Sequence, residues 1–306
     1  MKLFSSAPGL IAGLSLSFLS AQELTNLPPD PFGDIEVAET APDYAVEVDR
    51  NRGAFTLDAE DGEYVPGDHF AHWHWKAKPG RWGKFYVGLN YISNRTKLGV
   101  QVKFGDLAPV KSYAPRTGRE RVGNMILGTV YIPKNEEYQV TLLTGDQSNV
   151  PDFMVKGLEF TPAPEGETLG QSIDGTINLH AKSATTFAEK MRFEPNEEKN
   201  CLGFWTSEKD WAEWEFDVSS PGEFEVKVVH GCGEGNGGSD VNVLINDKTL
   251  SFKVEETGGF QNWKEVSIGK VKFDIPGRHK LAIMPVNKAG KAVMDVQKLV
   301  LTPAGS

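Results

Sequence analysis

The chain has 306 residues, enough for two domains of ordinary size. Its formal net charge is −10, which excludes non-specific attraction to DNA, RNA or an anionic membrane surface as its main mode of binding. Glycine (32 residues), proline (18 residues) and aromatic residues (10%) are frequent. This composition favours short strands joined by tight turns over long helices.

The N-terminal segment, residues 1–21, is typical of a secretory signal peptide. Lys2 is its only charged residue, an apolar run follows, and Ser20 and Ala21 offer small residues for cleavage. That apolar run is too short to span a bilayer, and no later run is apolar enough, so we expect no membrane span. We therefore predict a secreted or periplasmic protein. Residues 22–48, rich in proline and acidic residues, predict a linker.

The rest of the chain divides into two similar segments, 49–163 and 170–304. Each opens with an alternating strand, has a Pro-Gly turn that leads into another strand, and closes with a strand ending in Thr-Pro. We predict an all-β fold of two tandem antiparallel β-sandwiches of the jelly-roll, galactose-binding-like kind. We interpret the similarity as a tandem duplication; the alternative is two unrelated sandwiches that share generic turns.

Alternating apolar residues mark individual strands in the second segment. Phe224, Val226 and Val228 would face one side of a sheet while charged residues face the other. A similar alternation over 241–245 precedes Asn-Asp at 246–247, which predicts a hairpin turn.

The chain contains two cysteines, Cys201 and Cys232. In an oxidising compartment the expected state of such a pair is one disulfide. The alternative is two buried free thiols. Neither cysteine stands in a pattern that indicates a catalytic nucleophile.

The C-terminal segment contains a glycine-rich loop (231–239), the run Thr-Gly-Gly-Phe-Gln-Asn-Trp (257–263), Pro-Gly-Arg-His (276–279) and Met-Asp-Val (294–296). This pattern resembles family 6 and related carbohydrate-binding modules, which have a galactose-binding-like β-sandwich. It is especially similar to the accessory domains of sulfatases and glycoside hydrolases from planctomycetes and verrucomicrobia. The resemblance covers about residues 175–303 and implies a module that binds carbohydrate.

The resemblance also implies positions for site residues. It places Phe260 and Trp263 at the sugar, with polar residues of the glycine loop and the acid that starts the last strand beside them. Two positions depart from the family pattern: Met294 stands where an Asn is usual, and Lys182 where a calcium-binding Glu is usual. In the N-terminal segment the corresponding acid is present as Glu60, which makes it the candidate ligand of a structural calcium.

Sugars present apolar C–H faces and a rim of hydroxyl groups, so a binding site needs an exposed ring and planar hydrogen-bonding groups. Three regions offer both: the loops near residues 234–240 and 260–263, the segment around residue 205, and the N-terminal region around residues 73 and 116. Core packing is the alternative for each tryptophan. The predicted ligand-binding residues are Phe260, Asn262, Trp263, Glu234, Asn236, Asp240, Asp295, Trp205, Trp73, Trp75 and Arg116.

The N-terminal region also holds two charged features. His72 and His74 stand two apart on a predicted strand, share a face and could hold Zn²⁺ or Cu²⁺; the alternative is an aromatic cluster with hydrogen-bonded histidines. Arg116 belongs to an arginine-rich stretch whose guanidinium groups suit sulfate or carboxylate. The alternative, which the sequence favours, is a solvated loop.

The sequence lacks the nucleophile elbow, the P-loop, the dinucleotide fingerprint and the zinc-protease helix motif. We predict a secreted, non-catalytic protein that binds neutral or sulfated polysaccharide without a cofactor other than the implied calcium. A polysaccharide-degrading enzyme on another chain would be its partner. One alternative is a protein-interaction or scaffold module of a surface complex. Another is a hydrolase whose site lies in the N-terminal His/Trp region.

Overall fold

The computed structural model describes residues 44–66, 71–145 and 153–305, and within them the chain is nearly all β, as predicted. Two short 3₁₀ turns, η2 (Ala59–Asp61) and η3 (Ala181–Ser183), accompany the strands. Among these residues no helix is long and apolar enough to cross a membrane. The predicted signal peptide, and the linker up to residue 43, lie outside the described residues.

Two sheets form the first half of the described chain. Strand pairing within them is antiparallel throughout. One sheet has the order β1 (Phe55–Asp58), β9 (Phe153–Pro162), β4 (Gly83–Ser93), β7 (Gly123–Ile132). The other has the order β2 (Glu63–Pro66), β3 (Ala71–Ala77), β8 (Tyr138–Thr144), β5 (Lys97–Phe104), β6 (Val110–Pro115).

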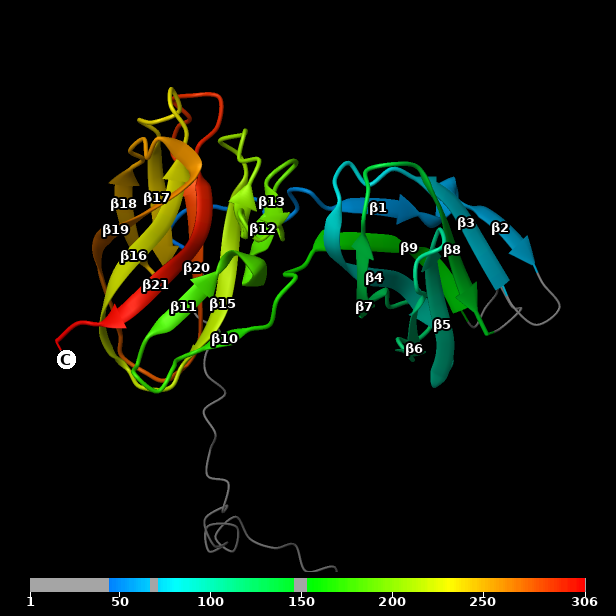
Figure 1. Cartoon of the computed structure of the whole chain (residues 1–306). Coiled ribbons are helices and arrows are strands. Elements are labelled where there is room, and N and C mark those ends of the chain that lie inside the picture. Colours follow the sequence, from blue (N-terminus) through cyan, green and yellow to red (C-terminus); the bar gives the residue numbers. More distant parts are fainter. Residues whose placement is uncertain (1–43, 67–70, 146–152, 306) are drawn as a thin grey trace, which may run out of the picture. The chain divides into compact units, whose positions relative to one another are not determined.

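Two further sheets form the second half, and Figure 1 shows β16 and β21 of one of them side by side. The third sheet has the order β10 (Leu169–Gly170), β15 (Trp211–Val218), β20 (Gly277–Pro285), β17 (Asp240–Ile245), β18 (Lys248–Lys253), with β12 (Thr185–Phe187) also on β15. The fourth has the order β13 (Arg192–Glu194), β14 (Cys201–Gly203), β21 (Asp295–Pro303), β16 (Gly222–Cys232), β19 (Gly259–Phe273), with β11 (Ile177–His180) also on β21.

Each pair of sheets encloses its own hydrophobic core. The predicted alternation is confirmed in β16, where Phe224, Val226 and Val228 are buried, and Asn246 makes the predicted turn between β17 and β18 with a φ of 53°. Contacts group the described residues into one compact unit. The division into tandem domains, and their duplication, therefore stay predictions.

The segment 44–52, which we call the strap, packs on the outer face of the third sheet. Tyr44 joins a small apolar cluster with Trp211 of β15, Leu244 of β17 and Ala282 of β20. The strap is also held by hydrogen bonds, because the indole nitrogen of Trp211 donates to the carbonyl of Asp49 at 3.0 Å. The third sheet is thus apolar on both faces, because the core of the second half covers one face and the strap covers the other.

The carboxylate of Asp210 connects the strap to the beginning of β13. It is fully buried and accepts hydrogen bonds from the guanidinium of Arg52 at 2.7 Å and from the backbone N–H of Glu189 at 3.2 Å and Met191 at 3.3 Å. Its own carbonyl accepts from the indole of Trp205 at 2.9 Å. One buried acid therefore holds three segments that are distant in the sequence.

Three histidines of the second half have pKa values below the ordinary range, and burial is the main cause in each. They are His180, His230 and His279. His230 is the most enclosed, with 1% of its surface exposed. Because the buried imidazole resists protonation while the unfolded chain does not, acid favours unfolding.

Replacing Asp210 with alanine should lower the free energy of unfolding by about 3–5 kcal/mol, since it leaves Arg52 and the three backbone N–H groups of residues 189–191 without their buried partner. Denaturant unfolding followed by circular dichroism measures this loss. Asp217 is the matched control: it pairs with Arg278 at 3.1 Å with both side chains more than half exposed. Asp217→Ala should cost about 1 kcal/mol or less, and equal losses in the two variants would contradict this role for Asp210.

The free energy of unfolding should fall as the pH drops below about 6.5, the ordinary histidine pKa, and the loss should be smaller in His230→Leu. Each histidine with a lowered folded-state pKa stabilises the fold above its unfolded pKa, and this contribution disappears as the pH falls through the folded value. Unfolding curves of both proteins between pH 8 and pH 5 test this. Superimposable pH profiles would show that His230 does not contribute.

Candidate functional site

Four strands bring polar side chains together at one end of the fourth sheet. Glu194 on β13 pairs with Cys201 on β14, Asp295 on β21 pairs with Gly231 on β16, and Gln261 lies on β19. Cross-strand neighbours on one face lie within contact distance of each other. The pairing therefore brings together two acids, a thiol and an amide. We call these four residues, Glu194, Cys201, Asp295 and Gln261, the β-end cluster.

The distances within the β-end cluster are short. The Cys201 Sγ lies 3.7 Å from Asp295 Oδ2, and the Gln261 side-chain amide donates to the same oxygen at 3.1 Å. Lys199 donates to Glu194 Oε1 at 3.0 Å. One ligand atom from each of Glu194, Cys201 and Asp295 lies within 4.8 Å of the others.

Burial dominates the electrostatics of the cluster. Burial, and after it the neighbouring Glu194 carboxylate, raises the pKa of Asp295 to about 7. Burial and the same two acids also raise the pKa of the Cys201 thiol well above its usual range, so this thiol is a poor nucleophile. The hydrogen bond to Glu194 raises the pKa of Lys199.

Gly203, the last residue of β14, makes the space that the two acids occupy. A Cβ atom at this position would collide with Glu194 Oε2 and would lie 3.5 Å from Asp295 Oδ1. A larger residue would therefore push the carboxylates apart. The glycine is needed here for room, because its φ lies outside the left-handed region.

An exposed aromatic ring stands next to the cluster. Phe204 follows Gly203, has a φ of 57° and keeps 46% of its surface exposed. The guanidinium of Arg192 lies 3.8 Å from its ring centroid and 3.3 Å from that of Trp82. Burial lowers the pKa of Arg192 to about 10, so it stays charged at neutral pH. A left-handed φ is costly for phenylalanine, so the tertiary structure holds the ring in this place.

A shallow pocket of about 520 Å³ adjoins this ring. It combines apolar rings with an acid, an amide and two cations within one small surface. Such a surface can stack on an apolar face and hydrogen-bond to hydroxyl or carboxylate groups at its edge. Its lining residues are Trp82, Arg192, Phe193, Glu194, Pro195, Asn196 and Lys199.

The loops that sequence reasoning selected lie at the same end of the fourth sheet. The Phe260 ring packs against the backbone of Gly233 and is half-buried, while Trp263 on β19 is also half-buried. Asn262 and Glu234 are exposed.

Two of the predicted loop residues serve mainly to shape the loops. The Asn236 Oδ1 accepts from the N–H groups of Lys291 and Ala292, each at 3.0 Å. Asp240 pairs with Lys253 at 2.7 Å, and the hydrogen bonds from this lysine and from Asn287 lower its pKa.

Three predicted sugar-stacking residues are buried in the cores, which corrects the sequence prediction. Trp205 has no exposed surface, and Trp73 and Trp75 are 5% and 4% exposed. The indole nitrogens of Trp205 and Trp75 donate to backbone carbonyls, which satisfies the one polar group that each ring carries. Trp211 and Trp214 are buried as well, at 2% and 0% exposed.

The structure has Cys201 and Cys232 as free, buried thiols, so the predicted disulfide is wrong for this structure. The two thiols make different contacts: Cys201 faces Asp295, whereas the Cys232 Sγ lies 3.7 Å from the carbonyl of Gly233 and 3.9 Å from that of Val293.

The other candidate residues lie in the first half of the chain. Glu60 is exposed on η2, and Arg116 is exposed after β6. His72 and His74 have ring centroids 5.8 Å apart on β3, and His74 Nδ1 lies 3.1 Å from Thr141 Oγ1. Among the described residues they do not belong to a three-ligand cluster; the only such cluster there is the β-end cluster.

Sequence reasoning missed Phe204, Glu194 and Lys199. Phe204 directly precedes Trp205, and the sequence analysis selected the larger ring, Trp205, as the one that binds sugar. The end of β14 at Gly203 decides which ring turns outward. Glu194 carries no motif of its own, so only strand pairing could bring it to Asp295.

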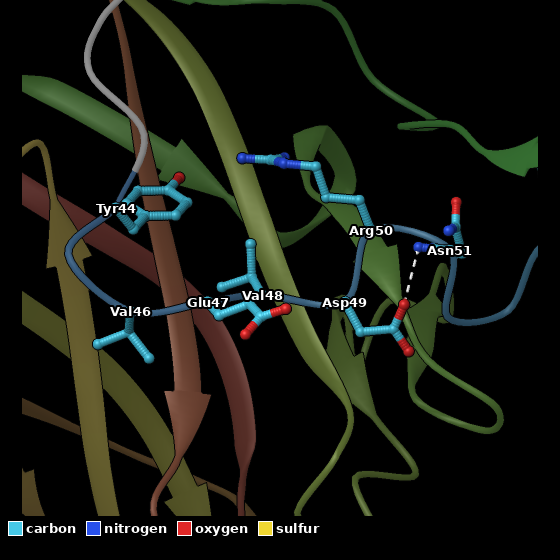
Figure 2. Close-up of a pocket in the computed structure, with 7 residues that line it drawn as sticks. All are labelled: Tyr44, Val46, Glu47, Val48, Asp49, Arg50 and Asn51. Carbon is cyan, nitrogen blue, oxygen red and sulfur yellow. Dashed lines mark hydrogen bonds between the residues drawn. The ribbon is translucent and has the colours of Figure 1, made fainter.

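A second hollow, of about 620 Å³, lies along the strap (Figure 2). Its described lining comes from one short stretch, Tyr44 and residues 46–51. Within that stretch the Asn51 N–H donates to the Asp49 carboxylate over 3.0 Å, and Figure 2 draws this bond as a dashed line. A ligand site normally draws groups from several elements, so the pocket beside Phe204 is the better candidate.

Comparison with known proteins leaves the activity of the chain open. Residues 184–305 match a family model described as a domain of unknown function, DUF5077. This match includes the β-end cluster and the Phe204 pocket, apart from Trp82. No curated protein matches the chain.

Solved structures similar to the chain include carbohydrate-binding modules. A family 35 module from Cellvibrio japonicus is 14% identical over 43% of this chain and 94% of its own, with a TM-score of 0.36. A family 35 module from Clostridium thermocellum is 15% identical over 42% of this chain and 98% of its own, also with a TM-score of 0.36.

The chain also resembles a family 6 module of Cellvibrio mixtus lichenase 5A, solved with cellotriose, at 15% identity over 42% of this chain and 96% of the module, with a TM-score of 0.31. It spans only 29% of a Podospora anserina mannanase, with 11% identity over 38% of this chain and a TM-score of 0.30. Similarities this weak carry no argument about what this chain binds.

The two neighbouring rings, Phe204 and Trp205, should respond differently to truncation. Trp205→Ala should lower the free energy of unfolding by about 3–5 kcal/mol, because it opens a cavity in the core. Phe204→Ala should cost about 1 kcal/mol or less, because it removes a half-exposed ring and its contact with Arg192. Denaturant unfolding compares them; a large loss for Phe204→Ala would show that its ring is structural.

Proposed function

We propose that the chain is a secreted, non-catalytic protein that binds poly- or oligosaccharide at the surface around Phe204. The observation that carries this proposal is the exposed Phe204 ring, held at a left-handed φ beside a pocket lined by polar groups. An exposed ring of this kind is the usual platform for the C–H face of a sugar.

The groups beside the ring suit sugar hydroxyls. Glu194 can accept hydrogen bonds, Asn196 can both donate and accept, and Lys199 can donate. Lys199 is already hydrogen-bonded to Glu194 and keeps about two-fifths of its side chain exposed, so the pair is ordered and still reachable. A pre-ordered rim lowers the entropy cost of binding.

The chemistry of the pocket favours binding over catalysis. The nearest thiol, Cys201, is buried and has a raised pKa, so it is not an activated nucleophile. Of the two nearby acids only Glu194 lines the pocket, whereas Asp295 is buried behind it at 7% exposed. A glycosidase needs its two carboxylates on either side of the sugar bond. Secretion follows from the predicted signal peptide and is part of the proposal.

The test is retardation of the purified chain in native gels that contain neutral or sulfated polysaccharides, with and without Ca²⁺. Phe204→Ala should weaken the binding at least about tenfold, equivalent to 1.4 kcal/mol, because it removes the stacking surface. Retardation by any of these polymers that is lost in Phe204→Ala would support the proposal.

Tyr113→Ala is the matched control, since Tyr113 is an exposed aromatic residue, at 61%, in the first half of the chain. It should bind as the unmodified chain does. If Tyr113→Ala loses binding and Phe204→Ala does not, the site lies in the first half. If no polysaccharide retards the chain, carbohydrate binding is wrong, and the scaffold alternative should be tested with protein partners.

A further inference from the structure

We propose that Glu194, Cys201 and Asp295 bind a divalent cation of borderline softness, of which Zn²⁺ is the natural example. These side chains come from three adjacent strands and bring one ligand atom each to within 4.8 Å of the others. This inference concerns a metal site behind the pocket and does not rest on carbohydrate binding.

The charges of the cluster favour a cation. Two carboxylates lie together in a largely buried place: Asp295 is 7% exposed, and the Glu194 side chain is 15% exposed. The amine of Lys199 reaches only one of them, at Glu194 Oε1. Buried acids that face each other repel unless a proton or a metal ion lies between them.

The thiol indicates which cation. Ca²⁺ and Mg²⁺ take oxygen ligands and six or more contacts, whereas Zn²⁺ accepts thiolate, imidazole and carboxylate ligands in a four-coordinate site. Cys201 is one of two buried thiols, and it is the one that points at an acid, with Sγ 3.7 Å from Asp295 Oδ2. Cys232 faces carbonyl groups instead.

The surroundings provide space and a further polar group. Gly203 lacks the Cβ that would fill the gap beside Glu194 and Asp295, so the gap is built into the backbone. Gln261 contacts Asp295 Oδ2 at 3.1 Å from the exposed side. Its amide can orient Asp295 or offer its oxygen as a fourth ligand, and the partly exposed Glu194 provides a path for the ion.

The site is tested by titrating the full chain with Co²⁺, a spectroscopic substitute for Zn²⁺. The chain is first treated with a chelator, and a non-chelating reductant is present throughout the titration. We expect one equivalent to bind with a thiolate-to-cobalt charge-transfer band, and Zn²⁺ to displace it. Cys201→Ser should lose the band, and Glu194→Gln, which removes the most exposed ligand, should weaken Zn²⁺ binding at least about tenfold.

Cys232→Ser is the matched control, because it removes the other buried thiol and leaves the three proposed ligands intact. It should keep the charge-transfer band. Near-ultraviolet circular dichroism establishes whether each variant is folded. If Cys201→Ser is not folded, the loss of Zn²⁺ affinity in Glu194→Gln decides whether the site exists. The proposal is overturned if no stoichiometric Co²⁺ binds, if binding gives no thiolate band, if the band survives Cys201→Ser, or if Ca²⁺ alone binds.

Discussion

The buried carboxylate of Asp210 is the constraint on which the second half of the molecule depends. The carboxylate binds the strap through Arg52 and orients the N–H groups that precede β13. The backbone carbonyl of the same residue accepts a hydrogen bond from the indole of Trp205. Because β13 carries Arg192 and Glu194, the position of the candidate site follows from this one acid. A buried acid is tolerable only with such a full set of donors, so its partners are as necessary as the acid itself.

The end of the fourth sheet shows the opposite arrangement. Asp295 and Glu194 lie close together with few donors, and burial raises the pKa of Asp295 to about 7. Such a pair costs stability unless a proton or a cation intervenes. The fold nevertheless keeps room for it through Gly203, at a place where a side chain would have separated the acids. Proteins accept local costs of this kind mostly where a site is needed.

The exposed ring and the thiol of the buried cluster belong to one short segment. Cys201 and Phe204 are three residues apart, with one in the interior and the other in solvent, and Gly203 lies between them. The left-handed φ of Phe204 ends the strand and turns the next residue, Trp205, back into the core. The same backbone turn thus separates a surface suited to stacking from a cluster suited to a metal ion.

Composition and alternation were enough to predict an all-β chain, the strands around residues 224–245 and the turn at Asn246, because a two-residue period of apolar side chains reflects burial directly. They could not tell which aromatic rings lie outside: Trp205, Trp73 and Trp75 look like candidates in sequence, yet they fill cores. Nor could they bring Glu194, Gln261 and Asp295 together. Strand order and register decide such contacts, because these depend on pairings between residues far apart in the chain. The two thiols, for the same reason, face different partners rather than each other.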